Sequence, residues 1–119
     1  MALHLPIGRH LLIEYYGCQP ERINNHEQLE TLLYDAAIKA GTKPIKSTAH
    51  QFEPHGASAM VLIEESHITI HTYPEYGYAA IDIFTCGDDA KPYEAHLFLH
   101  KTLKPQYCLI NDVYRGVGK

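Results

Sequence analysis

The sequence predicts an α+β fold, a two-layer sandwich in which two helices cover one face of a largely antiparallel sheet. Two stretches carry apolar residues at helical spacing, and about six shorter stretches show the apolar runs or the alternation of strands. Several consecutive strands are joined by links of only a few residues, which require antiparallel pairing. The chain has 119 residues and neither a repeat nor a linker, so we expect one domain, 1–119, around one core.

The first part of the chain predicts a strand, a helix and a second strand. Residues 9–16 form an apolar run typical of a buried strand, and the loop 18–25 after it contains the pair Asn24 and Asn25 and can cap a helix. The helix has one apolar stripe at i, i+3, i+4, i+7, i+8 and i+11, made of Leu29, Leu32, Leu33, Ala36, Ala37 and Ala40. Gly41 ends this helix, and residues 45–52 form the next strand.

The second part predicts three strands, a helix and a final strand. The three strands cover 58–65, 67–73 and 78–85. The second helix starts at Asp88 or Asp89, has Pro92 in its first turn and runs to about Leu103. Residues 106–113 supply the last strand of the sheet.

The strand over 67–73 indicates which face of the sheet the helices cover. Ile68 and Ile70 share one face of this strand, and the opposite face carries polar and aromatic residues. The residues of that opposite face are His67, Thr69, His71 and Tyr73. We expect the helices to pack on the isoleucine face, which leaves the other face open to a ligand, a second subunit or both.

Composition excludes several classes of function. The formal net charge is −4 with neutral histidines, so the chain offers no basic surface for nucleic acid or for an anionic membrane. The longest apolar runs are too short to cross a bilayer, and the first residues lack the pattern of a secretory signal. Three widely spaced cysteines predict reduced thiols in a cytoplasm rather than a disulfide framework or a structural zinc site.

Residues 64–77 contain a hydroxyl nucleophile, two imidazoles, three carboxylates and two aromatic rings. Ser66 follows the apolar run 60–63, so we expect it at a tight turn or sharp bend between two strands. A serine there usually makes a local backbone hydrogen bond. A nucleophile held at a strained position can instead attack a substrate or its own chain. Strict alternation puts Ser66 and His71 on opposite faces, so a direct pair requires the chain to twist at Ser66.

Several other side chains have both an ordinary and a functional interpretation. Cys86 ends an apolar strand and precedes a glycine, so it is either a small buried hydrophobe or a titratable thiol. Phe52 and Tyr73 are either ordinary strand aromatics or the two sides of a stacking site for a flat ligand. His96 and His100 are four residues apart on the second helix, which is a weak zinc-like spacing, and we expect no metal site.

Three stretches of the chain closely resemble the short prokaryotic S-adenosylmethionine decarboxylase proenzymes. They are 65–87 (ESHITIHTYPEYGYAAIDIFTCG), 50–58 (HQFEPHGAS) and 10–18 (HLLIEYYGC). The resemblance covers most of the chain, and its central motif is specific. It implies a self-processing, pyruvoyl-dependent carboxy-lyase that supplies decarboxylated S-adenosylmethionine for the synthesis of spermidine and other polyamines.

Members of this family cut their own chain, and the resemblance implies a cut between Glu65 and Ser66. The Ser66 hydroxyl attacks the Glu65 carbonyl and forms an ester by an N-to-O acyl shift. Elimination and hydrolysis leave a covalent pyruvoyl group, derived from Ser66, at the start of chain 66–119, and chain 1–65 stays bound. The pyruvoyl ketone forms a Schiff base with the substrate amine and accepts the electrons that departing carbon dioxide leaves behind.

The resemblance also implies roles for three residues near the cut. Ser58 and His71 match positions that assist processing, in which His71 removes the α-proton so that the ester eliminates. Cys86 matches the proton donor that completes turnover. The family resemblance further suggests a homodimer that covers the open sheet face and shares active-site residues between its two chains.

The substrate-binding positions include a departure from the family pattern. Phe52 and Tyr73 match the two aromatic positions that sandwich adenine, and Glu75 lies where a ribose-binding carboxylate is expected. The second aromatic is usually Trp, and tyrosine offers less area for stacking. We therefore expect a decarboxylase of S-adenosylmethionine, with L-arginine or L-ornithine as alternative substrates of the same machinery. A further alternative is a non-catalytic paralogue that regulates a partner decarboxylase.

Overall fold

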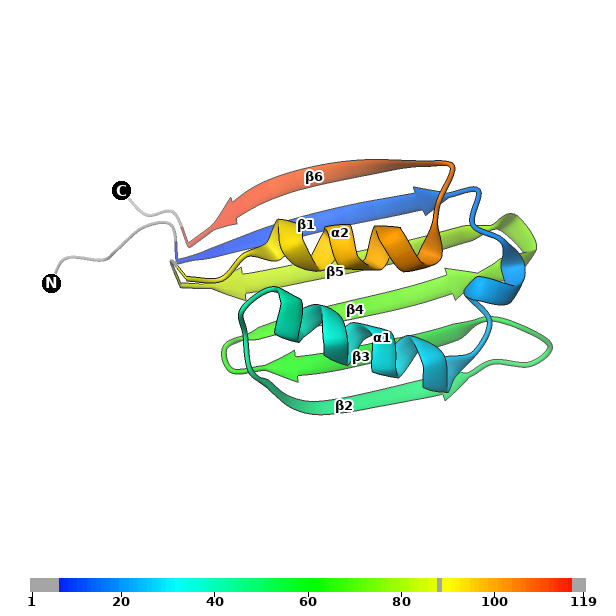
Figure 1. Cartoon of the computed structure of the whole chain (residues 1–119), viewed down its shortest axis with the longest axis horizontal. Helices are drawn as coiled ribbons and strands as arrows, with labels where there is room; N and C mark the ends of the chain where they lie inside the picture. Colours follow the sequence, from blue (N-terminus) through cyan, green and yellow to red (C-terminus); the bar gives the residue numbers. More distant parts are fainter. Residues whose placement is uncertain (1–6, 88, 117–119) are drawn as a thin grey trace, which may run out of the picture.

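The computed structural model describes residues 7–87 and 89–116 of the chain. Its six strands form one antiparallel sheet in the order β2-β3-β4-β5-β1-β6, and both helices lie on the same face of it (Figure 1). The strands are β1 (Gly8–Tyr16), β2 (Pro44–Gln51), β3 (Ala57–Ile63), β4 (Ser66–Tyr73), β5 (Tyr78–Cys86) and β6 (Tyr107–Arg115). The helices are α1 (His26–Lys39) and α2 (Pro92–Leu103), with short 3₁₀ turns η1 (Pro20–Arg22) and η2 (Pro74–Tyr76). The predicted α+β two-layer sandwich is confirmed.

Helix α1 has the cap and the apolar stripe that its sequence predicts. The Asn25 side chain accepts a hydrogen bond from the Gln28 N–H at 3.0 Å, which satisfies one of the free donors of the first turn. The predicted stripe residues from Leu29 to Ala40 are all buried. Because the stripe lies against the sheet, the opposite side of α1 is exposed to solvent.

Helix α2 begins at Pro92, so the predicted start at Asp89 is wrong, and Asp88 lies outside the described residues. The cause is a tertiary contact, because the Lys91 N–H donates a hydrogen bond to the carbonyl of Ala40 at 2.9 Å. This bond ties the chain to the end of α1 while Lys91 is still non-helical (φ −124°, ψ 76°). Pro92, which has no N–H, then occupies the first turn.

Strands β3 and β4 form a hairpin that is tighter than predicted. Strand β3 ends at Ile63, two residues before the predicted end, and Ile63 pairs with Ser66. Glu64 and Glu65 thus make a two-residue turn, in which Glu65 has a left-handed φ of 61°. The predicted bend at Ser66 is confirmed, since Ser66 is the first residue of β4.

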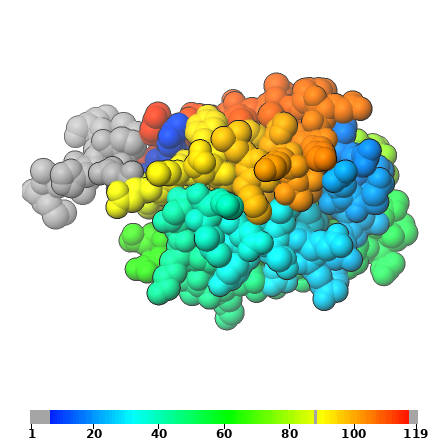
Figure 2. All heavy atoms as spheres, viewed as in Figure 1, coloured from blue at the N-terminus to red at the C-terminus, as the bar shows by residue number. Residues whose placement is uncertain are grey.

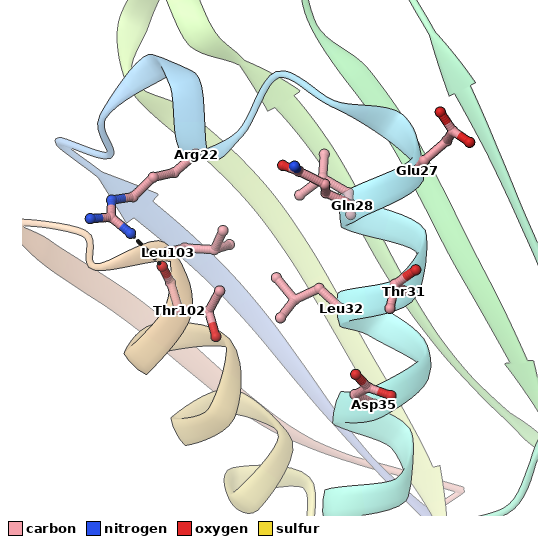
Figure 3. A pocket seen from close by; sticks show the side chains of 9 residues that line it. Arg22, Glu27, Gln28, Thr31, Leu32, Asp35, Thr102 and Leu103 are labelled. Atoms are coloured by element: carbon pink, nitrogen blue, oxygen red, sulfur yellow. Dashed lines mark hydrogen bonds between the residues drawn. The ribbon is translucent and has the colours of Figure 1, made fainter.

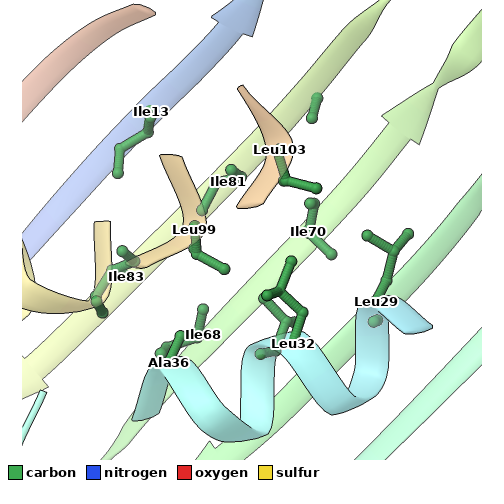
Figure 4. Close-up of a cluster of buried hydrophobic side chains, with 14 of the residues drawn as sticks. Ile13, Leu29, Leu32, Ala36, Ile68, Ile70, Ile81, Ile83, Leu99 and Leu103 are labelled. Atoms are coloured by element: carbon green, nitrogen blue, oxygen red, sulfur yellow. The ribbon is translucent and has the colours of Figure 1, made fainter. Parts of the chain in front are cut away.

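The core lies between the helices and the sheet, and it determines the register of β4 (Figure 4). Ile68 and Ile70 are fully buried against side chains from both helices, among them Leu32 and Leu99. Burying an isoleucine stabilises the fold by about 1.5–3 kcal/mol. A slip of β4 by one residue would move both isoleucines to the open face and His71 into the core, so the register is strongly specified.

Figure 2 shows the face of the molecule that the two helices cover. The other face of the sheet is covered by no helix or strand of the described residues. Several large apolar side chains are exposed on the uncovered face. They are Leu12, Met60, Leu62, Tyr73, Tyr107, Leu109 and Val113. So much exposed apolar surface on one face is typical of an interaction site. Neither helix of the described residues is long and apolar enough to cross a membrane.

Candidate active site

The first group of site residues lies at the β3–β4 turn and is called the cleavage cluster: Glu65, Ser66 and Cys86. Ser66 is only 6% exposed, and its Oγ accepts a hydrogen bond from the Cys86 backbone N–H at 3.1 Å. This bond links the start of β4 to the end of β5, because Cys86 is the last residue of that strand. The Ser66 hydroxyl is therefore held directly beside the peptide bond that precedes it.

The thiol of Cys86 contacts the same peptide bond from another side. Its Sγ donates a hydrogen bond to the Glu65 carbonyl oxygen at 3.1 Å. Glu65 itself has a left-handed backbone, which costs a residue other than glycine on the order of 1–3 kcal/mol. The cleavage cluster thus combines a nucleophilic hydroxyl, a strained carbonyl and a donor aimed at the carbonyl oxygen.

The second group of residues lies toward the other end of β4 and is called the His71 half-site. Its centre is a short contact of 2.6 Å between Ser58 Oγ and His71 Nδ1, and these residues face each other across β3 and β4. A hollow of about 300 Å³ surrounds this contact. Its lining residues are Phe52, His55, Gly56, Ser58, His71, Thr72, Tyr73 and Glu75.

The rim of the His71 half-site carries exposed aromatic rings and a charged pair. Phe52 and Tyr73 are 46% and 44% exposed, so both rings have free surface for a ligand. The Glu75 carboxylate lies 3.2 Å from His55 Nε2. The predicted stacking residues and the predicted ribose-binding carboxylate therefore share one hollow with His71.

A network of backbone contacts holds the loop that carries Phe52 and His55. Phe52 N–H donates to the Gly56 carbonyl at 2.8 Å, and Gly56 N–H donates to Asn24 Oδ1 at 2.8 Å. Gly56 has a φ of +99°, and a Cβ there would meet the Thr72 carbonyl oxygen at 3.0 Å. Only glycine fits this position without strain, so it brings the loop close to β4.

Strand β4 does not twist at Ser66, so the two groups stay apart within one chain. Ser66 shares the helix-covered face with Ile68 and Ile70, whereas His71 lies on the open face. His71 is five residue steps beyond Ser66, which is about 16 Å along the strand. Figure 1 shows the β3–β4 turn and the β2–β3 loop at opposite ends of the sheet. One chain therefore brings Ser66 to Cys86 and Ser58 to His71, but not Ser66 to His71.

Two polar contacts of the open face were missed by sequence reasoning. His10 Nε2 lies 2.8 Å from Asp82 Oδ1, and the Tyr78 hydroxyl donates to the Glu14 carboxylate. Both contacts join β1 to β5, and nothing in the sequence shows that these two strands are neighbours. The Ser58–His71 contact could have been found, because a two-residue turn at 64–65 determines every pairing of the β3–β4 hairpin.

The remaining candidates have structural surroundings. Burial raises the pKa of the Cys18 thiol to about 11, which makes this cysteine unreactive near neutral pH. His96 is buried, and its Nδ1 lies 2.9 Å from the Tyr15 hydroxyl, while its ring packs against His100. Within 7–87 and 89–116, no group of three His, Cys, Asp or Glu side chains is arranged to hold a metal ion.

A groove between α1 and α2 lies on the helix-covered face (Figure 3). Arg22 and Thr102 stand on one side of it, joined by a 3.4 Å hydrogen bond from Arg22 Nη1 to the Thr102 carbonyl. Gln28 and Asp35 of α1 stand on the other side. None of the predicted site residues lines this groove.

Known proteins of one family are similar to this chain in sequence and in structure. The family model described as S-adenosylmethionine decarboxylase matches residues 9–116. The S-adenosylmethionine decarboxylase proenzyme of Thermosipho melanesiensis is 46% identical over 110 residues, covering 92% of this chain and 85% of the relative. That of Caldicellulosiruptor saccharolyticus is 43% identical over 111 residues, covering 93% and 90%. The crystal structure of adenosylmethionine decarboxylase from Aquifex aeolicus superposes with a TM-score of 0.88 at 37% identity, covering 95% of this chain and 93% of that one.

Proposed function

Because the chain belongs to the S-adenosylmethionine decarboxylase family, we propose that it is a self-processing, pyruvoyl-dependent decarboxylase of S-adenosylmethionine. The observation that carries this proposal is the cleavage cluster. Ser66 Oγ is held by the Cys86 N–H, and the Cys86 thiol contacts the carbonyl oxygen of Glu65. In an ordinary turn, the serine hydroxyl bonds to nearby backbone. Here Cys86, at the end of β5, supplies one donor to Ser66 Oγ and another to the Glu65 carbonyl oxygen.

Self-cleavage begins at the Glu65–Ser66 peptide bond. Ser66 Oγ attacks the Glu65 carbonyl carbon, the carbon–nitrogen bond breaks, and the acyl group moves from the amide nitrogen to the hydroxyl oxygen. Negative charge develops on the Glu65 carbonyl oxygen during the attack, and the Cys86 thiol already donates a hydrogen bond to this atom. Breaking the peptide bond also releases the left-handed strain of Glu65.

The ester then needs a base that removes the α-proton of residue 66. We assign this step to His71, whose Nδ1 is oriented by the Ser58 hydroxyl at 2.6 Å. Elimination releases the Glu65 carboxylate, and hydrolysis of the resulting dehydroalanine releases ammonia and leaves a pyruvoyl group on chain 66–119, with chain 1–65 still paired to it through β3 and β4. When present, this pyruvoyl group supplies an electrophilic carbonyl for the substrate amine and an electron sink for decarboxylation.

His71 lies too far along β4 to serve residue 66 of its own chain. A homodimer packed face to face through the open sheet removes this difficulty. A two-fold axis places the cleavage cluster of one chain over the His71 half-site of its partner, and it does so twice. The exposed apolar residues of the open face support this arrangement.

The His71 half-site of the partner chain then receives the substrate. Phe52 and Tyr73 stack on the adenine ring, and Glu75 accepts hydrogen bonds from the ribose hydroxyls. The Cys86 thiol returns a proton to the α-carbon after decarboxylation, because it lies directly beside residue 66. Arginine or ornithine would leave the two exposed rings and the carboxylate without a nucleoside to hold, so the half-site favours S-adenosylmethionine.

Denaturing mass spectrometry and a decarboxylation assay test this function. We expect two fragments, 1–65 and 66–119, the second with a blocked N-terminus. We also expect labelled carbon dioxide to be released from S-adenosylmethionine and not from arginine or ornithine. An intact chain after long incubation at neutral pH would support the regulatory paralogue. Release from arginine or ornithine alone would overturn the substrate assignment.

A complementation experiment tests the shared site. Cys86→Ala damages only the cleavage cluster, and His71→Ala damages only the half-site. Each variant alone should be inactive, because both of its sites lack one residue. Co-expression should restore up to about a quarter of the wild-type activity, since half of the dimers are mixed and each mixed dimer has one intact site. Absence of any restoration in demonstrably mixed dimers would overturn the shared arrangement.

A further inference from the structure

Four tyrosine rings stand side by side on the open face and form the tyrosine ladder: Tyr73 of β4, Tyr78 of β5, Tyr16 of β1 and Tyr107 of β6. Tyr73 and Tyr78 stack with ring centroids 5.6 Å apart and an interplanar angle of 23°. The next two spacings are 5.5 Å and 4.8 Å, at 29° and 25°. The ladder begins at the His71 half-site, because Tyr73 lines that hollow.

The packing against Tyr78 determines the orientation of the Tyr73 ring. Tyr73 is 44% exposed, and its hydroxyl makes no hydrogen bond to another described residue. The two residues pair directly across β4 and β5, where aromatic neighbours contribute most. One side of the Tyr73 ring is therefore occupied by Tyr78, which leaves the other side for a ligand.

Tyr78 is itself held at its far end. Its hydroxyl donates a hydrogen bond to the Glu14 carboxylate, and Tyr16 covers the ring on the side away from Tyr73. Burial and the contact with Glu14 raise the pKa of Tyr78, so the hydroxyl stays protonated and keeps donating at physiological pH. Tyr78 is thus fixed by a stack on each side and by a charge-assisted bond at its tip.

We propose that Tyr78 and Glu14 are positioning residues that hold the Tyr73 ring ready to stack on the adenine of the substrate. The inference rests on the proposed function, because it assigns Tyr73 the place next to adenine. A side chain that is ordered before binding loses less conformational freedom when the ligand arrives. The support matters more here because Tyr73, smaller than the usual tryptophan, offers less stacking area of its own.

The contribution should appear in binding and not in chemistry. Neither Tyr78 nor Glu14 is hydrogen-bonded to the cleavage cluster or to the Ser58–His71 pair. Loss of the Tyr78 ring should therefore raise KM for S-adenosylmethionine about three- to tenfold while kcat stays within about twofold. Cleavage at Glu65–Ser66 should proceed as in the wild type.

The test compares Tyr78→Leu with Tyr107→Leu in the full-length, processed protein. Tyr107 is the matched control, because it belongs to the same ladder and face but stacks on Tyr16 and not on Tyr73 or Tyr78, and leucine keeps its place on the open face apolar. Four quantities are measured: the cleaved fraction, kcat for S-adenosylmethionine, KM for S-adenosylmethionine, and the Kd of 5′-methylthioadenosine. The last compound probes nucleoside stacking alone, because it carries the adenosine but no amino-acid group. We expect Tyr78→Leu to bind it about three- to tenfold more weakly, and Tyr107→Leu to bind it as the wild type does.

Two results would overturn the inference: an unchanged Kd in Tyr78→Leu, or an equal loss in Tyr107→Leu. If Tyr78→Leu does not fold, Glu14→Gln decides, since it keeps all four rings and weakens only the bond to Tyr78. It should raise the Kd about twofold, and a wild-type value would contradict the proposal. A wild-type chain that is not cleaved or does not decarboxylate S-adenosylmethionine would instead refute the proposed function. The two failures are therefore distinguishable.

Discussion

The two ends of β4 are built by different physical means. At the cleavage cluster, a left-handed Glu65 precedes a buried hydroxyl, and the hydrogen bonds come from a neighbouring strand end. At the His71 half-site, the side chains stand on an open face, two aromatic rings are exposed, and a hollow has room for a ligand. One end is strained and closed, and the other is relaxed and open.

In the proposed mechanism, the cleavage cluster supplies the peptide bond that is cut once, and the His71 half-site supplies the base for elimination and the hollow for the substrate. A strained turn beside a buried hydroxyl suits a reaction that happens once, because the strain is lost when the peptide bond breaks. An open hollow with exposed rings suits repeated binding and release. The same strand carries both ends, so in the proposed mechanism a second copy of the chain brings them together.

The strongest way to break the comparison is to remove the nucleophile. Ser66→Ala should abolish cleavage and all decarboxylation while leaving the fold and the His71 half-site intact, because no other hydroxyl lies beside the Glu65 carbonyl in the cleavage cluster. Mass spectrometry should show one uncut chain. Ser47→Ala is the control, since Ser47 lies on β2 and its hydroxyl donates a hydrogen bond to the Glu30 carboxylate of α1 at 2.5 Å. Cleavage that persists in Ser66→Ala would remove the basis for assigning the cut.

The opposite end is tested by Phe52→Ala, which should affect binding and not processing. Stacking on a base is worth about 1–3 kcal/mol, so KM for S-adenosylmethionine should rise about tenfold or more. The cleaved fraction should not change, because the proposed processing steps use the side chains of Ser66, Cys86 and His71 and not the Phe52 ring. Tyr76→Ala provides a matched control on an aromatic that is 78% exposed and does not line the hollow. A cleavage defect in Phe52→Ala would mean that the two ends are not separate.

Glu65→Gly measures the strain of the closed end. Glycine accepts a positive φ freely, so the substitution removes most of the ground-state strain that cleavage relieves. Cleavage should slow about tenfold, which corresponds to a strain near 1.4 kcal/mol. The time course can be followed by mass spectrometry after cell-free synthesis. Glu64→Gly, at the other turn residue, should cleave at the wild-type rate, and equal slowing in both variants would argue for general loosening of the turn.

Much of this division could be predicted from β4 alone. The alternation of Ile68 and Ile70 with His67 and His71 predicts the covered and open faces, because one register buries both isoleucines. The same alternation predicts that Ser66 and His71 lie on opposite faces unless the chain twists at Ser66. The structure shows no such twist. The polar and aromatic side of this alternation also predicts the open face of the sheet.

The rest depends on contacts between distant segments. The start of α2 at Pro92 follows from the hydrogen bond between the Lys91 N–H and the Ala40 carbonyl. The sequence around Lys91 does not predict this contact. The contact between Tyr78 and Glu14 requires β5 to lie beside β1, which is a matter of strand order. Strand order depends on the packing of the whole sheet, so it cannot be predicted from any single segment of the sequence.

The smallest expected effect concerns acid and the residue that follows the nucleophile. Burial, with the nearby His10 and Arg115, lowers the pKa of His67 below its ordinary 6.5, although Asp82 acts in the opposite direction. The folded chain therefore holds fewer protons at this site than the unfolded chain below about pH 6.5. Stability should fall as the pH drops below that value, and the loss should end once the pH passes below the folded pKa.

Equilibrium unfolding of Ser66→Ala, which stays a single chain, gives the pH dependence without interference from cleavage. Adding His67→Gln removes one titrating group and should flatten the decline between about pH 7 and pH 5 by less than one proton. His96, whose pKa burial also lowers, contributes with the same sign from beneath α2 and should leave a residual slope. Parallel curves for the two variants would show that His67 titrates alike in the folded and unfolded chains. The closed end would then differ from the open end in strain and hydrogen bonding, but not in its response to acid.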